Sequence, residues 1–262
     1  MRKIKTTLLL LLSLPLFFML FWIFAVPGDV VRERIEKEIN QTQGADLSVA
    51  LNGFRKGPFF NLAIDSLELY IADMPLLTIN DVSARPSLSN ILMGQLALSL
   101  TGKLGSGNIL GVLAYPEGSM LRIVEADIGS VTYLKKLGIQ GSGHLSAEAD
   151  LDLKTDSVKV TFQIPDLNIH KSEVVIPLIE AFHRIQGSFS ITGNRIELDS
   201  VSLEGEKGYA RLIGEITNGI ARLKLEVMPE ADKLSSLETM LITKYFVSPG
   251  YYVVPLEGSL RQ

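Results

Sequence analysis

The sequence predicts a mainly β protein: a single N-terminal transmembrane helix followed by a long, mainly antiparallel and strongly twisted sheet with short helices. Three observations lead to this prediction. Residues 6–26 carry no charge and are mostly apolar. The rest of the chain is more polar, and in several segments its apolar residues recur at every second position, as on a sheet with one buried face. Glycines, 22 in the chain, are frequent between these segments, where all-β chains turn.

The uncharged segment 6–26 is long enough to cross a membrane once. At about 1.5 Å per residue, a helix of this length matches a hydrocarbon layer of about 30 Å. A cleavable signal peptide normally has an apolar region of about 7–15 residues that ends in a small-x-small site. Here only Ala25 offers a weak cleavage position. We therefore expect an uncleaved transmembrane anchor at 6–26.

The short tail before the anchor decides the expected orientation. Arg2, Lys3 and Lys5 precede the anchor, whereas the basic residues that follow it are interleaved with acidic ones. A tail of residues 1–5 is easily retained while a long domain is translocated. We expect residues 1–5 in the cytoplasm and residues 27–262 outside it. The net charge of −4 argues against nucleic acid as a partner, and the absence of cysteine is compatible with an oxidising compartment.

An amphipathic helix is expected directly after the anchor. Val31, Ile35 and Ile39 recur every four residues among charged ones, and Pro27-Gly28-Asp29 precedes them. The expected role of this apolar stripe is to pack against the first strands. A position on the membrane surface is the alternative, which the acidic residues of the helix disfavour.

The clearest strand lies at 145–154, where one side is apolar and the other is polar. Further strands are expected at 60–71, 95–104, 158–164, 187–198 and 210–216, and Asn218-Gly219 predicts a hairpin turn into a strand at 223–227. Short helices are expected at 88–93, 131–137, 174–185 and 232–244. An apolar-Gln/Glu-Gly-Ser pattern at 139–142, 185–188 and 256–259 predicts a repeated unit of helix, glycine bend and strand.

The layout of the chain resembles that of type II secretion system protein N, a family similar to the AsmA-like periplasmic proteins. The resemblance rests on the single amino-terminal span, Pro27-Gly28-Asp29 with its amphipathic helix, and the closing segment 251–260 (YYVVPLEGSL). Segment 84–94 also resembles the strand-to-short-helix step of AsmA-like domains. The resemblance implies an accessory, non-enzymatic component of the cell inner membrane, with the bulk of the chain in the periplasm and other secretion-system inner-membrane proteins as partners. It also implies that 27–262 form one long curved sheet with an apolar concave face.

Residues that could carry chemistry are few and scattered. His144, His170 and His183 do not pair at ligand spacing, and no cysteine is present, so the sequence offers little for a zinc site. The alternating acidic residues at 150–156 resemble a calcium loop, but the intervening leucines favour a solvated strand. The glycine-rich segment 102–107 lacks the spacing of a phosphate loop. We expect no catalytic, cofactor-binding or metal-binding residue, and we expect that the protein is not an enzyme.

Two non-catalytic functions follow, and each has candidate residues. The first is the accessory role in type II protein secretion, for which a partner patch is expected at Tyr245, Phe246, Tyr251 and Tyr252. Burial of these aromatics in the last turn of the sheet is the alternative. The second is a lipid-binding or lipid-transfer module of the envelope that holds phospholipid on an apolar groove face. One strip of this face would consist of Leu145, Ala147, Ala149, Leu151 and Leu153, and packing of the strip against helices is the alternative.

Overall fold

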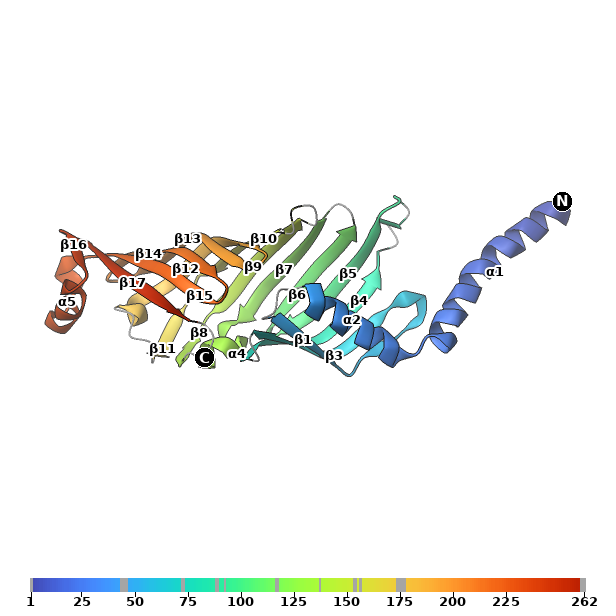
Figure 1. The fold of residues 1–262 in the computed structure, drawn as a ribbon, viewed down its shortest axis with the longest axis horizontal. Coiled ribbons are helices and arrows are strands. Elements are labelled where there is room, and N and C mark those ends of the chain that lie inside the picture. Colours follow the sequence, from blue (N-terminus) through green and yellow to red (C-terminus); the bar gives the residue numbers. More distant parts are fainter. Residues whose placement is uncertain are drawn as a thin grey trace.

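A computed structural model describes residues 2–42, 47–71, 74–87, 90–91, 93–115, 118–136, 138–152, 155, 157–172 and 178–259. Within these ranges the chain forms one long open antiparallel sheet of 15 strands, seen as a row in Figure 1. The prediction of a mainly β, antiparallel fold is confirmed. In spatial order the strands are β1 (Leu47–Asn52), β3 (Leu62–Ile71), β4 (Met74–Pro86), β5 (Leu96–Leu104), β6 (Gly107–Tyr115), β7 (Gly118–Asp127), β9 (His144–Asp152), β10 (Ser157–Ile164), β12 (Phe182–Thr192), β13 (Arg195–Gly205), β14 (Gly208–Thr217), β15 (Ile220–Pro229), β17 (Tyr251–Ser259) and β16 (Phe246–Ser248), while β2 (Arg55–Lys56) pairs with β3.

A second, two-stranded sheet arises from insertions between neighbouring strands of the large one. The strand β8 (Ile139–Ser142) lies between β7 and β9 in the sequence, β11 (Asn168–Ser172) lies between β10 and β12, and the two pair with each other. The helices are α1 (Arg2–Ala25), α2 (Gly28–Thr42), α4 (Thr132–Lys136) and α5 (Ser236–Thr243), and the 3₁₀ helices are η1 (Pro58–Phe60), η2 (Ile128–Ser130), η3 (Ile179–Ala181) and η4 (Ala231–Lys233).

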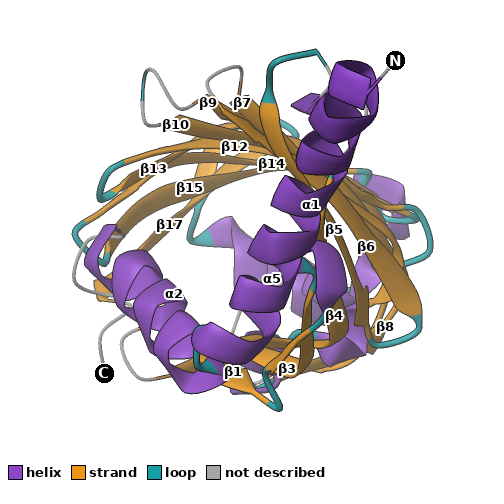
Figure 2. Cartoon of the chain, turned by 90° about the vertical axis from the view of Figure 1, so that its right-hand side faces the viewer, coloured by secondary structure: helices purple, strands orange, loops and turns teal. Residues whose placement is uncertain are grey.

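The large sheet curves strongly, as the view along its long axis shows (Figure 2). Register shifts interrupt several strand pairs, among them β4 with β5 and β7 with β9. At these two shifts Asp81 and Glu125 have positive φ angles of 51° and 53°. An extra residue in one strand bends that strand and increases the local twist. The curvature therefore comes from irregularities at particular residues in addition to the general twist of β sheets.

The helix α2 packs where the sequence places it. Its Ile35 and Ile39 contact the buried residues Val49 and Leu51 of the edge strand β1. The side-chain oxygen of Asn40 accepts a hydrogen bond from the Val49 backbone N–H at 2.8 Å, and Glu36 accepts one from the Leu51 N–H at 2.8 Å. These bonds satisfy donors on an edge that would otherwise be open to pairing with another strand. The expected role of the amphipathic helix against the first strands is confirmed.

Several predicted segments are confirmed, and others are wrong. The Asn218-Gly219 turn has φ angles of 53° and 76°, as a two-residue hairpin turn requires. The expected strand at 187–198 is instead a hairpin, because β12 ends at Thr192 and β13 begins at Arg195. The expected helix at 174–185 is wrong for its described part: only η3 is helical, and β12 begins at Phe182. Short apolar runs fit either structure, so spacing alone does not separate them.

Two further helix predictions are correct in place, and half of a third predicted helix lies outside the described residues. The segment 232–244 contains η4 and α5, and α5 begins with a capping box formed by Ser235 and Glu238. The segment 131–137 contains α4. In segment 88–93, residues 88, 89 and 92 are not described. The repeated glycine bend is wrong, because Gly141, Gly187 and Gly258 all lie inside strands.

The helix α1 occupies most of the segment that the sequence predicts to cross a membrane. Among the described residues, no helix is both long enough and apolar enough to span a bilayer.

Candidate functional site

One face of the large sheet is almost entirely apolar from strand to strand. Residues directly opposite each other on antiparallel strands point to the same side. Ala149 of β9 lies between Leu121 of β7 and Val160 of β10, and Val160 is followed across the sheet by Phe189 of β12 and Leu198 of β13. Continued in both directions, this row consists of Leu62, Ala84, Leu100, Gly111, Leu121, Ala149, Val160, Phe189, Leu198, Gly214, Leu223 and Leu256. We call this side of the sheet the apolar face.

The apolar face is the concave one. The helix α2 lies over the inner side of β1 in Figure 2, and it contacts the apolar side chains of Val49 and Leu51. The helix α5 lies at the opposite end of the molecule from α1 (Figure 1). Near α5, Tyr245 packs on the buried cluster that contains Leu225 and Val254. Each end of the apolar face is thus partly covered.

The middle of the apolar face is not covered in the same way. In β7, β9, β10 and β12, the side chains of Leu121, Ala149, Val160 and Phe189 are half-buried and none is fully buried. Phe162 is also half-buried, and its ring centroid lies 6.1 Å from that of Phe189. The chain exposes 16362 Å² in all, whereas a compact monomer of this mass exposes about 11,300 Å². The helix α1 projects from the sheet (Figure 1) and is one source of this excess.

Two apolar pockets adjoin the apolar face, at opposite ends of its strands. One, of about 470 Å³, lies where the small β8–β11 sheet and α4 approach the large sheet, and Leu134, Leu167, Ile185 and Leu203 are among its lining residues. The other, of about 540 Å³, is lined by Pro86, Leu96, Leu98, Leu113, Tyr115 and Leu151 together with neighbouring residues. Of these, Leu96 is 71 % exposed. The two pockets therefore extend the apolar face beyond the ends of its strands.

The predicted groove strip lies on this face as far as the structure describes it. Leu145, Ala147, Ala149 and Leu151 all have half-buried side chains on the apolar side of β9, and Leu153 lies outside the described residues. Sequence reasoning did not find the partners of the strip on the other strands. The signal was present in each strand as alternation, but only the cross-strand register shows that the apolar sides coincide.

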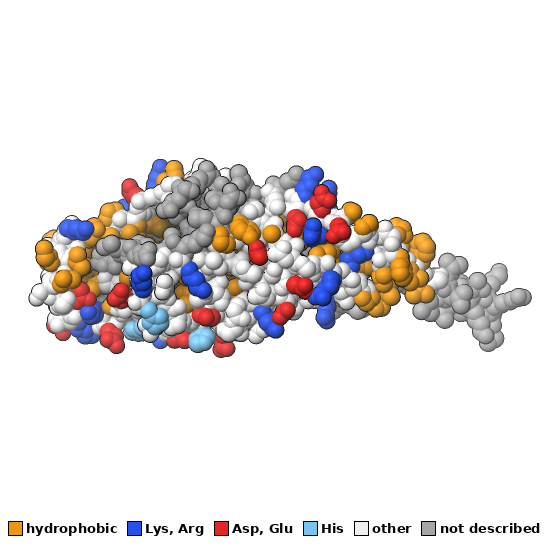
Figure 3. All heavy atoms as spheres, turned by 90° about the horizontal axis from the view of Figure 1, so that it is seen from below, with side chains coloured by type: hydrophobic (Ala, Val, Ile, Leu, Met, Phe, Trp, Pro, Cys, Tyr) orange, Lys and Arg blue, Asp and Glu red, His pale blue; other side chains and the backbone are white. Residues whose placement is uncertain are grey.

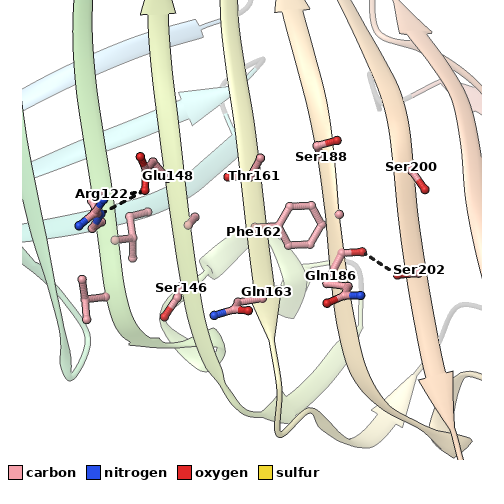
Figure 4. A pocket seen from close by; sticks show the side chains of 14 residues that line it. Arg122, Ser146, Glu148, Thr161, Phe162, Gln163, Gln186, Ser188, Ser200 and Ser202 are labelled. Atoms are coloured by element: carbon pink, nitrogen blue, oxygen red, sulfur yellow. Dashed lines mark hydrogen bonds and ion pairs between the residues drawn. The ribbon is translucent and has the colours of Figure 1, made fainter.

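The opposite face carries a shallow polar groove of about 560 Å³ over β7 to β13 (Figure 4). Its side chains are mainly hydroxyl and amide groups, including those of Ser146, Thr161, Gln163, Gln186, Ser188, Ser200 and Ser202. Arg122 and Glu148 form an ion pair at 2.8 Å within it, and the Ser202 hydroxyl donates a hydrogen bond to the Gln186 carbonyl at 3.2 Å. The strongest charges of the groove are thus paired with each other.

The structure does not bring the four candidate patch aromatics together on one surface. Tyr245 and Tyr252 pack against the buried cluster at the end of the sheet, as the burial alternative predicts. Phe246 is 55 % exposed and lies edge-to-face with Tyr252 at 5.9 Å. Tyr251 occupies the other face, where a hydrogen bond to the Glu226 carboxylate raises the pKa of its phenol. The four residues therefore do not lie together on one surface, and a partner role for them stays a prediction.

Other polar residues form small local pairs. His144 lies on the polar side of β9, as predicted, and its ring contacts the Asp166 carboxylate. That contact raises the pKa of His144, and together with the His144 backbone N–H bond at 2.8 Å it lowers the pKa of Asp166. In the part of the chain that the structure describes, no group of three or more His, Cys, Asp or Glu residues could hold a metal ion.

Comparison of the chain with protein-family models, with curated proteins and with solved structures finds no match. The resemblance to type II secretion system protein N, and with it the accessory role in secretion, therefore stays a prediction.

Proposed function

We propose that this chain is a membrane-anchored lipid-binding protein of the cell envelope, and that its apolar face holds acyl chains. One observation carries the proposal: the side chains in the middle of a concave, apolar face are only partly buried, whereas α2 and the residues near α5 pack on its two ends. Apolar surface left in water costs about 25 cal/mol per Å². A contiguous patch larger than a few hundred Å² normally marks a binding surface. A ligand that covers this face therefore gains free energy from apolar contact alone.

The chemistry of the face favours an acyl chain over a peptide. The backbone N–H and C=O groups of the inner strands are used in the antiparallel ladders. A peptide lying on this face would find few partners for its own backbone groups, and burying such groups without hydrogen bonds is costly. An acyl chain has no polar groups to satisfy, so it meets no such cost.

The length of the apolar face also fits a lipid. From β5 to β15 the sheet takes eight steps from strand to strand. At about 4.8 Å per step, the face follows an arc of about 38 Å. This is longer than the hydrocarbon layer of a whole bilayer, about 30 Å. The acyl chains of a phospholipid would fit along it, with the polar headgroup at one of the sheet edges.

The proposed anchor is α1, which would keep the sheet beside a source of lipid. Its 24 residues correspond to about 36 Å of helix, and residues 6–26 contain no charged side chain. The basic residues of the tail support a cytoplasmic amino terminus. In this proposal the tail is cytoplasmic, α1 lies in the inner membrane and the sheet lies in the periplasm.

Photo-crosslinking from two adjacent residues tests the proposal in the full chain. Phe162 lies on the apolar face and Thr161 is exposed on the polar face of the same strand. Benzoylphenylalanine is placed at either position in cells whose phospholipids carry a radioactive label. We expect labelled lipid on the chain substituted at Phe162 and none on the chain substituted at Thr161.

Other outcomes would contradict the proposal. Equal lipid labelling at both positions would mean non-specific contact with membrane, and labelling at neither would mean that acyl chains do not occupy the apolar face. A protein adduct from position 162 without lipid would favour the secretion-system alternative. Circular dichroism of both substituted chains shows whether each has kept its β structure.

A further inference from the structure

The segment between β2 and β3 presents two adjacent exposed aromatic residues in an unusual backbone conformation. Phe59 is 67 % exposed and Phe60 is 47 % exposed, and their φ angles are 55° and 61°. Bulky residues rarely adopt positive φ angles, because the side chain then crowds the backbone. Such strain persists where the surroundings over-determine it, and it is common at functional sites. The conformation does not bury the two rings, so core packing does not explain it.

This segment is fixed to the carboxyl-terminal end of α1. The Trp22 indole N–H donates to the Gly57 carbonyl at 3.1 Å, and the Trp22 and Phe60 ring centroids lie 5.1 Å apart. The Lys56 ammonium donates to the Trp22 carbonyl at 2.7 Å and also to the Val26 carbonyl, and it lies 4.9 Å from the Trp22 ring centroid. The last carbonyls of a helix lack partners within the helix, and a cation is favoured there. Lys56 therefore holds the segment against α1.

The two phenylalanines continue an apolar surface that begins on α1. In the second half of this helix, Phe17, Phe21 and Phe24 are 63 %, 53 % and 82 % exposed. Figure 3 shows hydrophobic side chains gathered at this end of the molecule. Tryptophan is favoured at the boundary between headgroups and acyl chains, and Trp22 lies where α1 meets the sheet domain.

We propose that Phe59 and Phe60 insert into the surface of the bilayer that holds α1, and so fix the amino-terminal end of the sheet on the membrane. The inference rests on the membrane anchor of the proposed function, and it adds a second attachment point. The occupant of this surface is lipid, because the exposed rings extend the apolar surface of α1: the Phe60 ring packs on Trp22, and the neighbouring Lys56 and Gly57 are hydrogen-bonded to the end of α1. A single helix lets a domain swivel, whereas two attachments fix its direction. The apolar face would then start at the membrane and lead away from it.

A depth measurement on the full chain in vesicles of phosphatidylethanolamine and phosphatidylglycerol tests this inference. The chain has no cysteine, so Phe59→Cys gives a unique site for a nitroxide label. Phe246→Cys is the matched control, because Phe246 is similarly exposed, at 55 %, and lies at the opposite end of the sheet. We expect oxygen to relax the label at position 59 more than a water-soluble nickel complex does, and the reverse at position 246.

A second measurement, on the single tryptophan, shows whether α1 is in the membrane independently of whether Phe59 and Phe60 insert. Quenching of Trp22 by brominated lipid reports on α1 in the same samples. If Trp22 is quenched while the label at position 59 is as accessible to nickel as the label at position 246, the anchor stands and the insertion of Phe59 and Phe60 is overturned. A label at position 59 shielded from both reagents would mean a protein contact and would also overturn it. If lipid reaches neither Trp22 nor position 59, the anchor and the insertion both fail.

Discussion

A negative charge in the middle of the apolar face should strongly reduce lipid occupancy. Ala149 is half-buried and lies between Leu121 and Val160 on the neighbouring strands. In Ala149→Glu, a carboxylate that must keep its water excludes the acyl segment that would lie over these three residues. We estimate that about four methylene groups lose contact at about 0.8 kcal/mol each, roughly 3 kcal/mol in all. This corresponds to about a hundredfold weaker binding.

The assay is the yield of lipid adduct from benzoylphenylalanine at position 162, measured in full-length chains. Ala149→Gln adds the same bulk without charge, and we expect it to lose less. Gln163→Glu adds the same charge on the polar face, where its cross-strand partners are Ser146 and Gln186, and we expect no loss. The apolar surroundings should raise the pKa of the introduced carboxyl, so acidification should partly restore the adduct of Ala149→Glu.

Two results would refute this reasoning. An unchanged adduct yield in a folded Ala149→Glu chain would mean that acyl chains do not pass over the centre of the face. An equal loss in Gln163→Glu would mean that charge acts at a distance or through folding, and that the apolar face is not the site. Far-ultraviolet circular dichroism and thermal unfolding of each variant separate loss of binding from loss of structure.

Three further predictions concern stability. Leu225→Ala removes a side chain that is only 3 % exposed, and it should lower the free energy of unfolding, measured by urea titration, by about 3 kcal/mol. Leu96→Ala, at a site that is 71 % exposed, should change this free energy little. Equal effects of the two substitutions would contradict the burial of Leu225. The Lys207 ammonium and the Ser235 cap lower the pKa of Glu238 from 4.5 to about 2, so the stabilisation from this carboxylate should be complete above pH 4.5 and should fade towards pH 2. The difference in melting temperature between the native chain and Glu238→Gln should therefore shrink as the pH falls over that range. A constant difference would argue against the Lys207–Glu238 ion pair. Gly214→Ala should destabilise the β14–β15 pair and lower the melting temperature. The φ angle of Gly214 is 129°, and an added Cβ would lie 2.3 Å from a backbone oxygen of β15. An unchanged melting temperature would contradict that geometry.

Local pattern was enough to predict individual elements where one structure clearly fitted best. The alternation in 145–154 predicted a strand with one wet face, which is confirmed as far as the described residues reach, to Asp152 of β9. Side chains in a strand point to opposite sides in turn. The four-residue spacing of Ile35 and Ile39 correctly predicted an amphipathic helix. Prediction failed at 174–185, where a short apolar run fits a helix or a strand. There the buried Phe182 packs against residues of strands that are distant in the sequence, and this packing stabilises the strand β12.

The candidate site could be predicted in part. One strip of it, on β9, follows from the sequence, but its extent depends on which residues lie opposite one another. A shift of one residue in register would place the row of Leu121, Ala149 and Val160 on alternating faces. The candidate aromatic residues are separated for a related reason: Tyr251 and Tyr252 are adjacent in the sequence and therefore point to opposite faces of β17.

By itself the sequence determined the mainly β class, the amphipathic helix after the first apolar segment, and the division of its clearest strand into an apolar and a polar side. These follow from the spacing of residues close together in the chain. Tertiary structure alone decided that the apolar sides of many strands join into one concave face, that the middle of this face is only partly buried, and that Phe60 packs beside Trp22. Those features depend on cross-strand register, on bulges such as the one at Glu125, and on hydrogen bonds between residues more than thirty positions apart.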